Sequence, residues 1–129
     1  MKTALYLRVP PEGTTNEPPA DDLVYVLHTF CETHALEALT PYIDEAPGEF
    51  GAWDRLLADL EAGAFQVLLT DRFARFVHDR ARLTCLLEAI STHDIRVILL
   101  MQGLDSATDV GKNALQAMTQ VLAAERDEK

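Results

Sequence analysis

Three arginines and one aspartate carry the clearest chemical signal in this sequence. Arg8 lies near the end of the run LYLRV at 5–9, and Asp71, Arg72 and Arg75 follow a second apolar run in the segment TDRFAR. A planar guanidinium group binds a phosphate through two parallel hydrogen bonds, and a neighbouring carboxylate can orient it. These residues therefore predict a phosphate-binding site, provided that the fold brings them together. The competing interpretation is that they form surface ion pairs, the more frequent role of arginines at strand ends.

The elements that must position these residues alternate along the chain. Apolar runs predict strands, and amphipathic patterns with a period near 3.6 residues predict helices between them. The order predicts an α/β fold, with a mostly parallel sheet of four or five strands flanked by helices. Ligands in such sheets bind beyond the C-terminal ends of the strands, where Arg8, Asp44 and Asp71 fall. The expected strands are 5–9, about 38–43, 65–71 and 95–101, and the expected helices begin near 21 and span 52–63, 77–93 and 109–126.

The length, the net charge and the apolar runs of the chain limit the classes of function that it can have. The chain has 129 residues and is expected to form one domain over 1–129. Its formal net charge of −10 disfavours binding to a phosphate backbone, so we expect DNA binding to be weak or absent. We see no apolar run long enough for a membrane span and no signal-peptide pattern, so we expect a cytoplasmic protein without membrane contact.

The order and spacing of four segments resemble a known family. LYLRV at 5–9, YIDE at 42–45, residues 52–75 and GLDSATDVGK at 103–112 are similar to the N-terminal catalytic domain of the resolvase/invertase family of serine recombinases. The resemblance extends from about residue 3 to 126. It implies a resolvase-like fold and a relation to DNA strand exchange, with Arg8, Asp71, Arg72 and Arg75 at the family's phosphate-binding positions.

The resemblance also indicates a lost reaction. In the family, a serine two positions after the strand-end arginine attacks the DNA phosphodiester; here that position is Pro10, which has no nucleophilic atom. An arginine common in the family falls near Phe50. We therefore expect no catalytic residue and interpret the chain as a pseudoenzyme that acts as an interaction or regulatory module. Thr14 and Thr15, in the same loop, are the alternative nucleophiles.

Two further interpretations stay open at this stage. One is a residual phosphoryl-transfer enzyme that uses Arg8, Asp71, Arg72 and Arg75, and the other is a protein that binds phosphate or nucleic acid through these residues without chemistry. The resemblance implies that the last helix helps to form a homodimer or a pair with a recombinase-like protein. No C-terminal DNA-binding domain is expected. The apolar stripe of this helix comprises Leu115, Met118, Val121 and Leu122.

Metal and cofactor sites are not predicted. His28, Cys31 and His34 are spaced three residues apart, and this spacing turns the outer pair to different sides of a helix. We interpret them as a core cysteine between exposed histidines. Cys31 and Cys85 are both expected to be buried free thiols. Ser106 or Thr108 is expected to cap the last helix.

Overall fold

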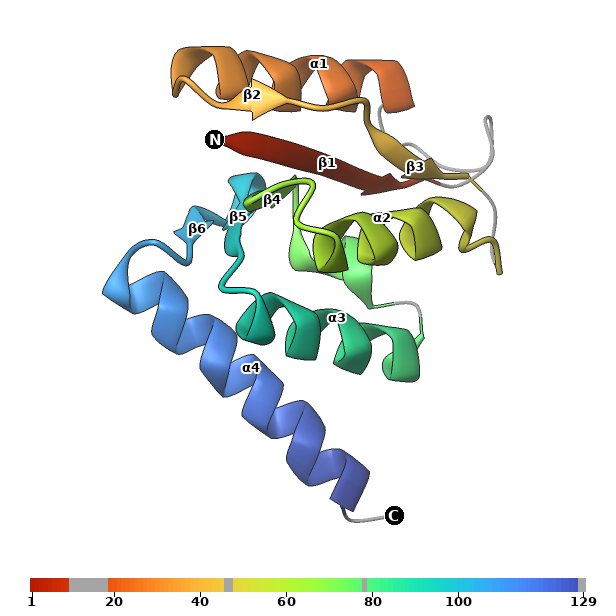
Figure 1. Cartoon of the computed structure of the whole chain (residues 1–129), viewed down its shortest axis with the longest axis vertical. Coiled ribbons are helices and arrows are strands. Elements are labelled where there is room, and N and C mark those ends of the chain that lie inside the picture. The colour runs from red at the N-terminus through yellow and green to blue at the C-terminus, as the bar shows by residue number, and fades with distance from the viewer. Residues whose placement is uncertain (10–18, 46–47, 78, 128–129) are drawn as a thin grey trace.

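The computed structural model describes residues 1–9, 19–45, 48–77 and 79–127, and the side chains as far as residue 121 (Figure 1). The strands are β1 (Lys2–Arg8), β2 (Glu37–Ala38), β3 (Tyr42–Asp44), β4 (Val67–Thr70), β5 (Arg96–Leu99) and β6 (Leu104–Asp105). The helices are α1 (Ala20–Thr33), α2 (Gly51–Glu61), α3 (Arg80–Thr92) and α4 (Asp109–Asp127), with short 3₁₀ turns η1 (Phe73–Phe76) and η2 (Leu100–Gln102).

The sheet confirms the predicted α/β class. Its strand order is β2-β1-β4-β5-β6, and β3 also pairs with β1. Every pairing is parallel except that of β6 with β5. The antiparallel β6 lies between the strand expected over 95–101 and the helix expected from 109, where no element was predicted. Its two residues are too few to give a strand periodicity.

The predicted strand over 38–43 is wrong as a single element. The chain instead forms β2 and β3, which pair with the two halves of β1. Pro41 lies between them and has no backbone N–H to donate to a sheet ladder. The interruption places β3 beside the C-terminal end of β1, where Arg8 is the register partner of Asp44.

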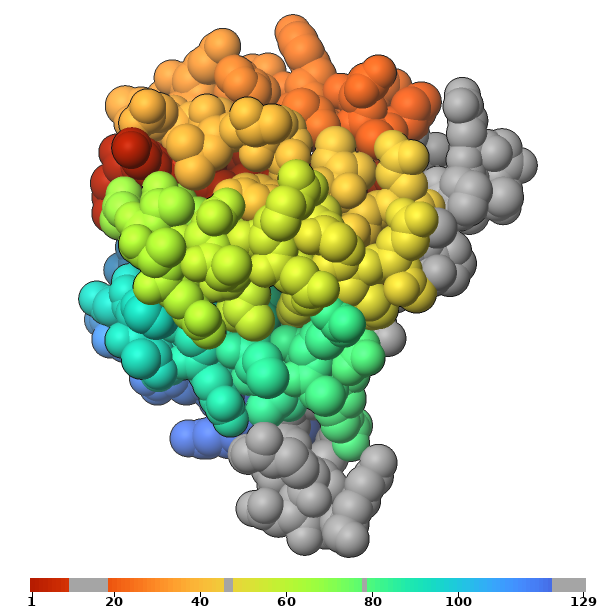
Figure 2. Space-filling view, turned by 45° about the vertical axis from the view of Figure 1, so that its right-hand side comes forward, coloured from red at the N-terminus to blue at the C-terminus, as the bar shows by residue number. Residues whose placement is uncertain are grey.

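Two cores lie on opposite faces of the sheet, as the side-chain alternation of β1 requires. Ala4 and Tyr6 belong to the core under α2 and α3, whereas Leu5 and Leu7 belong to the core under α1. In the space-filling view α2 and α3 cover one face of the sheet, and little of β1 reaches the surface there (Figure 2).

Local signals decide where α3 begins and how α4 is held. The helix predicted from residue 77 begins at Arg80, because the Asp79 carboxylate accepts the Arg82 backbone N–H at 3.0 Å as an N-cap. At α4 the Thr108 hydroxyl accepts the Gly111 N–H at 3.0 Å. Ser106, the alternative cap, instead accepts the Val97 N–H at 2.7 Å and so joins the sheet.

The last helix leaves the body of the domain. Figure 1 shows α4 starting beside β6 and extending past α3. Within the described residues, no helix is long and apolar enough to cross a membrane.

Candidate functional site

Five residues meet at the C-terminal edge of the sheet, and we call them the polar edge: Arg8, Asp44, Asp71, Arg72 and Arg75. The strand pairings bring them together, because β1 lies between β3 and β4. Four of the five are buried: Arg8, Asp44, Asp71 and Arg75 expose only 3–6% of their surface. Charged residues are seldom buried this deeply unless they are paired. The contacts of each residue therefore decide what the edge can do.

Asp71 and Arg75 form a two-pronged ion pair. Arg75 Nε donates to Asp71 Oδ1 and one terminal nitrogen donates to Oδ2, both at 2.8 Å. The other terminal nitrogen donates to the backbone carbonyl of Arg8 at 2.8 Å. Burial by itself would raise the pKa of Asp71, but the hydrogen bonds and charge of Arg75, helped by Arg72, hold that pKa below its usual value. Arg75 therefore ties the end of β4 to the end of β1.

Arg8 is covered by the segment that precedes α2. Its guanidinium donates a short hydrogen bond to the Glu49 carbonyl and lies 3.7 Å from an Asp44 carboxylate oxygen. Its Cζ lies 4.3 Å from the centre of the Phe50 ring, which is cation–π geometry. The Arg82 guanidinium lies on the same ring at 4.0 Å. Phe50 thus contacts both arginines.

The Asp44 side chain binds the free backbone N–H groups at the start of α2. Its two carboxylate oxygens accept the backbone N–H groups of Ala52 and Trp53 at 3.0 Å each. It also accepts the Tyr6 hydroxyl at 2.9 Å. Burial, followed by the nearby Asp44 charge and this hydrogen bond, raises the pKa of Tyr6 well above its usual value. The positive end of the α2 dipole therefore faces a carboxylate of the same chain.

Arg72 is the accessible arginine of the polar edge, with 44% of its side chain exposed. Its backbone N–H donates to Asp71 Oδ1 at 2.9 Å. The η2 turn fastens the residues on each side of it: the Met101 N–H donates to the Asp71 carbonyl at 2.7 Å, and the Gln102 side-chain oxygen accepts the Phe73 N–H at 2.8 Å. The backbone around Arg72 is therefore fixed, and its Nε lies 3.9 Å from an Asp71 carboxylate oxygen while much of the side chain stays exposed.

Sequence reasoning missed three contributors to this edge. Glu49 contacts Arg8 through its backbone carbonyl, and every residue type carries such a group, so the sequence does not indicate this contact. Arg82 reaches Phe50 from α3, and Gln102 reaches Phe73 from the last position of η2, one residue beyond the strand expected over 95–101. Pro10, Thr14 and Thr15 lie outside the described residues.

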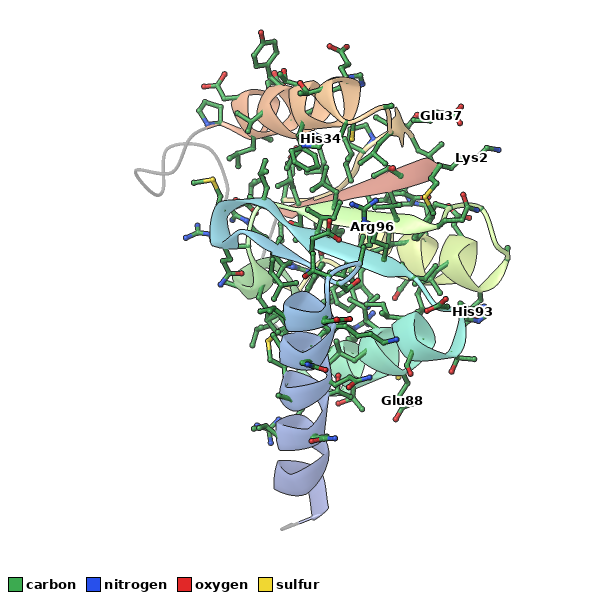
Figure 3. All side chains as sticks on the ribbon, turned by 90° about the vertical axis from the view of Figure 1, so that its left-hand side faces the viewer. Lys2, His34, Glu37, Glu88, His93 and Arg96 are labelled. Atoms are coloured by element: carbon green, nitrogen blue, oxygen red, sulfur yellow. The ribbon has the colours of Figure 1, made fainter. Side chains whose placement is uncertain are left out.

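The histidines and cysteines do not join the polar edge. His28 and His34 are exposed on α1 with Cys31 buried between them, as expected. His34 and His93 end α1 and α3 on opposite sides of the sheet, so they lie far apart (Figure 3). Cys85 is exposed, so the prediction that it is buried is wrong. Among the described residues, no three His, Cys, Asp or Glu side chains are grouped to hold a metal ion. His78 is not described.

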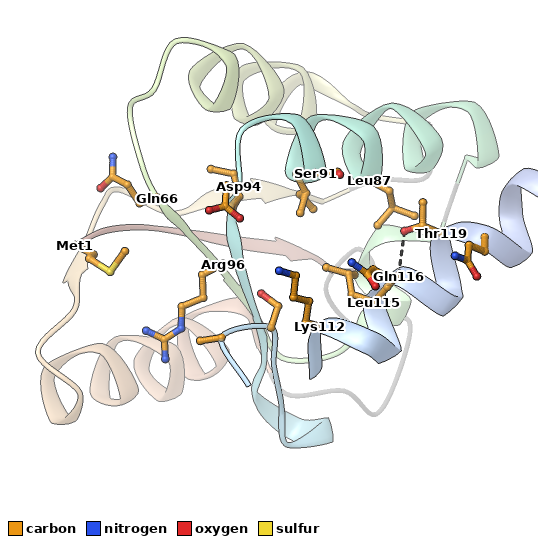
Figure 4. A pocket seen from close by; sticks show the side chains of 15 residues that line it. Met1, Gln66, Leu87, Ser91, Asp94, Arg96, Lys112, Leu115, Gln116 and Thr119 are labelled. Atoms are coloured by element: carbon orange, nitrogen blue, oxygen red, sulfur yellow. Dashed lines mark hydrogen bonds between the residues drawn. The ribbon is translucent and has the colours of Figure 1, made fainter. Parts of the chain in front are cut away.

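A hollow of about 850 Å³ lies away from the polar edge, between α3, α4 and the N-terminal ends of β4 and β5 (Figure 4). Arg96 in its wall is paired with Asp105 through hydrogen bonds of 2.9 and 2.6 Å. The contacts from α4 include Leu115, which also packs against the core under α2 and α3. Met118 is half-buried and Val121 is 57% exposed; the side chain of Leu122 is not described.

Comparison with known proteins gives a consistent result. Residues 3–129 match the family model described as "Resolvase, N terminal domain". No curated protein matches the chain. Among solved structures, the chain is similar to the N-terminal catalytic domain of TP901-1 integrase, with a TM-score of 0.82, 22% identity and 98% of each chain covered.

Two further structures share the fold. A resolvase family site-specific recombinase from Streptococcus pneumoniae has a TM-score of 0.75 at 19% identity, with 98% of this chain and 86% of that chain covered. The C-terminal catalytic domain of ISC1926 TnpA, an IS607-like serine recombinase, has a TM-score of 0.65 at 12% identity, with 95% and 99% covered.

Proposed function

The chain belongs to the resolvase N-terminal domain family, the catalytic domains of serine recombinases that exchange DNA strands, and from this premise we propose that it is a catalytically inactive member. The observation that carries the proposal is Pro10, two residues after Arg8. A proline side chain offers no hydroxyl or thiol to attack phosphorus, so no covalent protein–DNA intermediate forms at that position.

The contacts of the polar edge support the same conclusion. Arg75 donates from three nitrogens to Asp71 and to the Arg8 carbonyl, and Arg8 donates to the Glu49 carbonyl under the Phe50 ring. A phosphate would have to displace these contacts, and breaking a buried ion pair is costly. In our account Arg8 and Arg75 stabilise the fold, and the domain acts as an interaction or regulatory module.

The partner is a second copy of the chain or another recombinase-like protein, bound through α4. Support comes from the apolar residues that this helix carries along its length: Val121 is exposed and Met118 is only half-buried. Light scattering over a range of concentrations tests the pairing. We expect a mass increase with concentration that is lost in Met118→Glu and kept in Gln120→Glu, a matched change at an exposed position. A monomer at every concentration would remove self-association from the proposal.

A trap for covalent intermediates tests the inactivity. The protein is incubated with supercoiled plasmid, denatured, and examined for protein attached to DNA, with an active serine recombinase on its own site as the positive control. We expect no adduct from this chain. An adduct would refute the proposal, and its disappearance in Thr14→Ala or Thr15→Ala would identify the substitute nucleophile.

One observation favours a second candidate function, which is phosphate or nucleic-acid binding. The Arg72 side chain is 44% exposed at the edge where the family handles phosphate. In this alternative, Arg72 makes the first contact with a phosphate, Arg8 and Arg75 supply positive charge behind it, and Asp71 orients Arg75. A residual phosphoryl transfer would need the same residues. Oligonucleotide binding that depends on Arg72 would distinguish it from the inactive module.

A further inference from the structure

Arg8, Phe50 and Arg82 form a three-layer stack that links β1, the start of α2 and α3. The Phe50 ring has the Arg8 guanidinium 4.3 Å from its centre and the Arg82 guanidinium at 4.0 Å. A ring that contacts two cations gains electrostatic attraction from both contacts. The stack therefore holds Phe50 in place at the polar edge.

The outer arginine is anchored by two carboxylates from different helices. Arg82 hydrogen-bonds to Asp54 of α2 and lies 3.9 Å from Asp79, the N-cap of α3. About a third of its side chain is exposed, in contrast to Arg8, which is buried. Arg82 thus fastens Phe50 from the solvent side.

The residue before the ring completes the cover. The Glu49 carbonyl accepts a hydrogen bond from Arg8, so adjacent residues contact Arg8 through a backbone oxygen and an aromatic face. An open hollow of about 520 Å³ is lined by Glu49, Phe50 and Arg55. Phe50 is half-buried at the margin of the core under α2 and α3, so opening the segment moves the ring from that margin toward this hollow and leaves the fully buried core residues in place.

We propose that Glu49 and Phe50, latched by Arg82, form an autoinhibitory cap that keeps Arg8 from binding a phosphate-type anion. Opening the cap moves the aromatic ring and the carbonyl oxygen, and the guanidinium then regains the donors and the surface that an oxyanion requires. Removing the latch loosens the cap without touching Arg8. The cap does not involve residue 10. A failed test of the cap would therefore leave the proposed lack of catalysis unchanged.

The test measures thermal unfolding of the whole chain in inorganic phosphate against chloride at equal ionic strength. Phosphate is excluded from protein surfaces and raises most melting temperatures without binding, so the wild type gives the baseline difference between the two salts. In Phe50→Ala this difference should be a few degrees larger than in the wild type, since an anion that binds only the folded state raises the melting temperature further. Arg82→Ala should show a smaller increase over the wild-type difference. Phe50→Trp, which keeps an aromatic face, should behave as the wild type does.

Two outcomes would overturn the cap. One is a Phe50→Ala protein that folds but whose difference in melting temperature between phosphate and chloride equals that of the wild type. The other is a phosphate-specific rise that survives in the double variant Phe50→Ala with Arg8→Gln, because the anion would then bind elsewhere. If the double variant does not fold, the Arg82→Ala variant is the deciding test. A larger difference in melting temperature between phosphate and chloride than in the wild type supports the cap, and an equal difference overturns it.

Discussion

Arg75 and Asp71, four residues apart, are joined by two parallel hydrogen bonds of 2.8 Å at the buried end of β4. Breaking a buried pair by removing one partner leaves the other charge uncompensated, at a cost of roughly 3–5 kcal/mol. We expect Arg75→Gln to lower the free energy of unfolding by about that amount. Urea titration measures it, with Arg55→Gln, a change at an exposed arginine, as the control. Equal stabilities of the two variants would show that the pair contributes little.

The same pair predicts how acid acts on the fold. The pKa of Asp71 is lower in the folded state than in the unfolded chain, where it is about 3.9. Its contribution is therefore fully present above that unfolded value and is lost as the pH falls toward and through the folded pKa. Unfolding free energies between pH 6 and pH 2 should fall more steeply for the wild type than for Asp71→Asn. Parallel curves would contradict the assignment.

Gln102 is predicted to hold the backbone beside Arg72. Its side-chain oxygen accepts the Phe73 N–H at 2.8 Å, and a net contribution of about 1 kcal/mol corresponds to roughly a fivefold change in a local opening equilibrium. Gln102→Leu should speed amide exchange at Phe73 by about that factor. Gln102→Glu keeps the acceptor oxygen and should leave exchange slow. If the two variants speed exchange equally, the hydrogen bond from Phe73 to Gln102 is not what protects this amide.

Gly111 is predicted to be required for the seating of α4. A Cβ at this position would lie 2.1 Å from the Asp105 carbonyl oxygen, so α4 or β6 would have to move. Gly111→Ala should destabilise the domain by about 1–3 kcal/mol. Gly51, at the start of α2, has open space around its Cβ position, so Gly51→Ala should be neutral or slightly stabilising. A tolerated Gly111→Ala would mean that the close approach is easily relieved.

The central strands and the helices that cover them can be predicted from the sequence. The apolar runs around Leu5, Leu68 and Val97 predict three central parallel strands, and the alternation with amphipathic helices predicts the layers that cover them. The parts that were missed are short or depend on distant partners. The β6 strand has two residues, and Pro41 divides what looked like one strand into two.

The polar edge was only half predictable, for a physical reason. Strand ends fix which residues meet, so Arg8, Asp71 and Arg75 could be placed together from their positions alone. Burial and partner choice depend on the full packing: Glu49 contacts Arg8 from 41 residues away in the sequence, and the Arg75 guanidinium reaches the Arg8 carbonyl from 67 residues away. Cys85 illustrates the same limit, since its helical neighbours are apolar but its own side faces outward.

Fluorescence anisotropy with a labelled DNA duplex at low salt tests the central claim most directly, namely that the polar edge now serves the fold and not DNA. The wild type and Arg72→Ala are titrated side by side, because Arg72 is the accessible arginine of the edge. We predict no saturable binding by either protein, in keeping with the net charge of −10. Saturable binding by the wild type that Arg72→Ala abolishes would contradict the account and establish a working phosphate site.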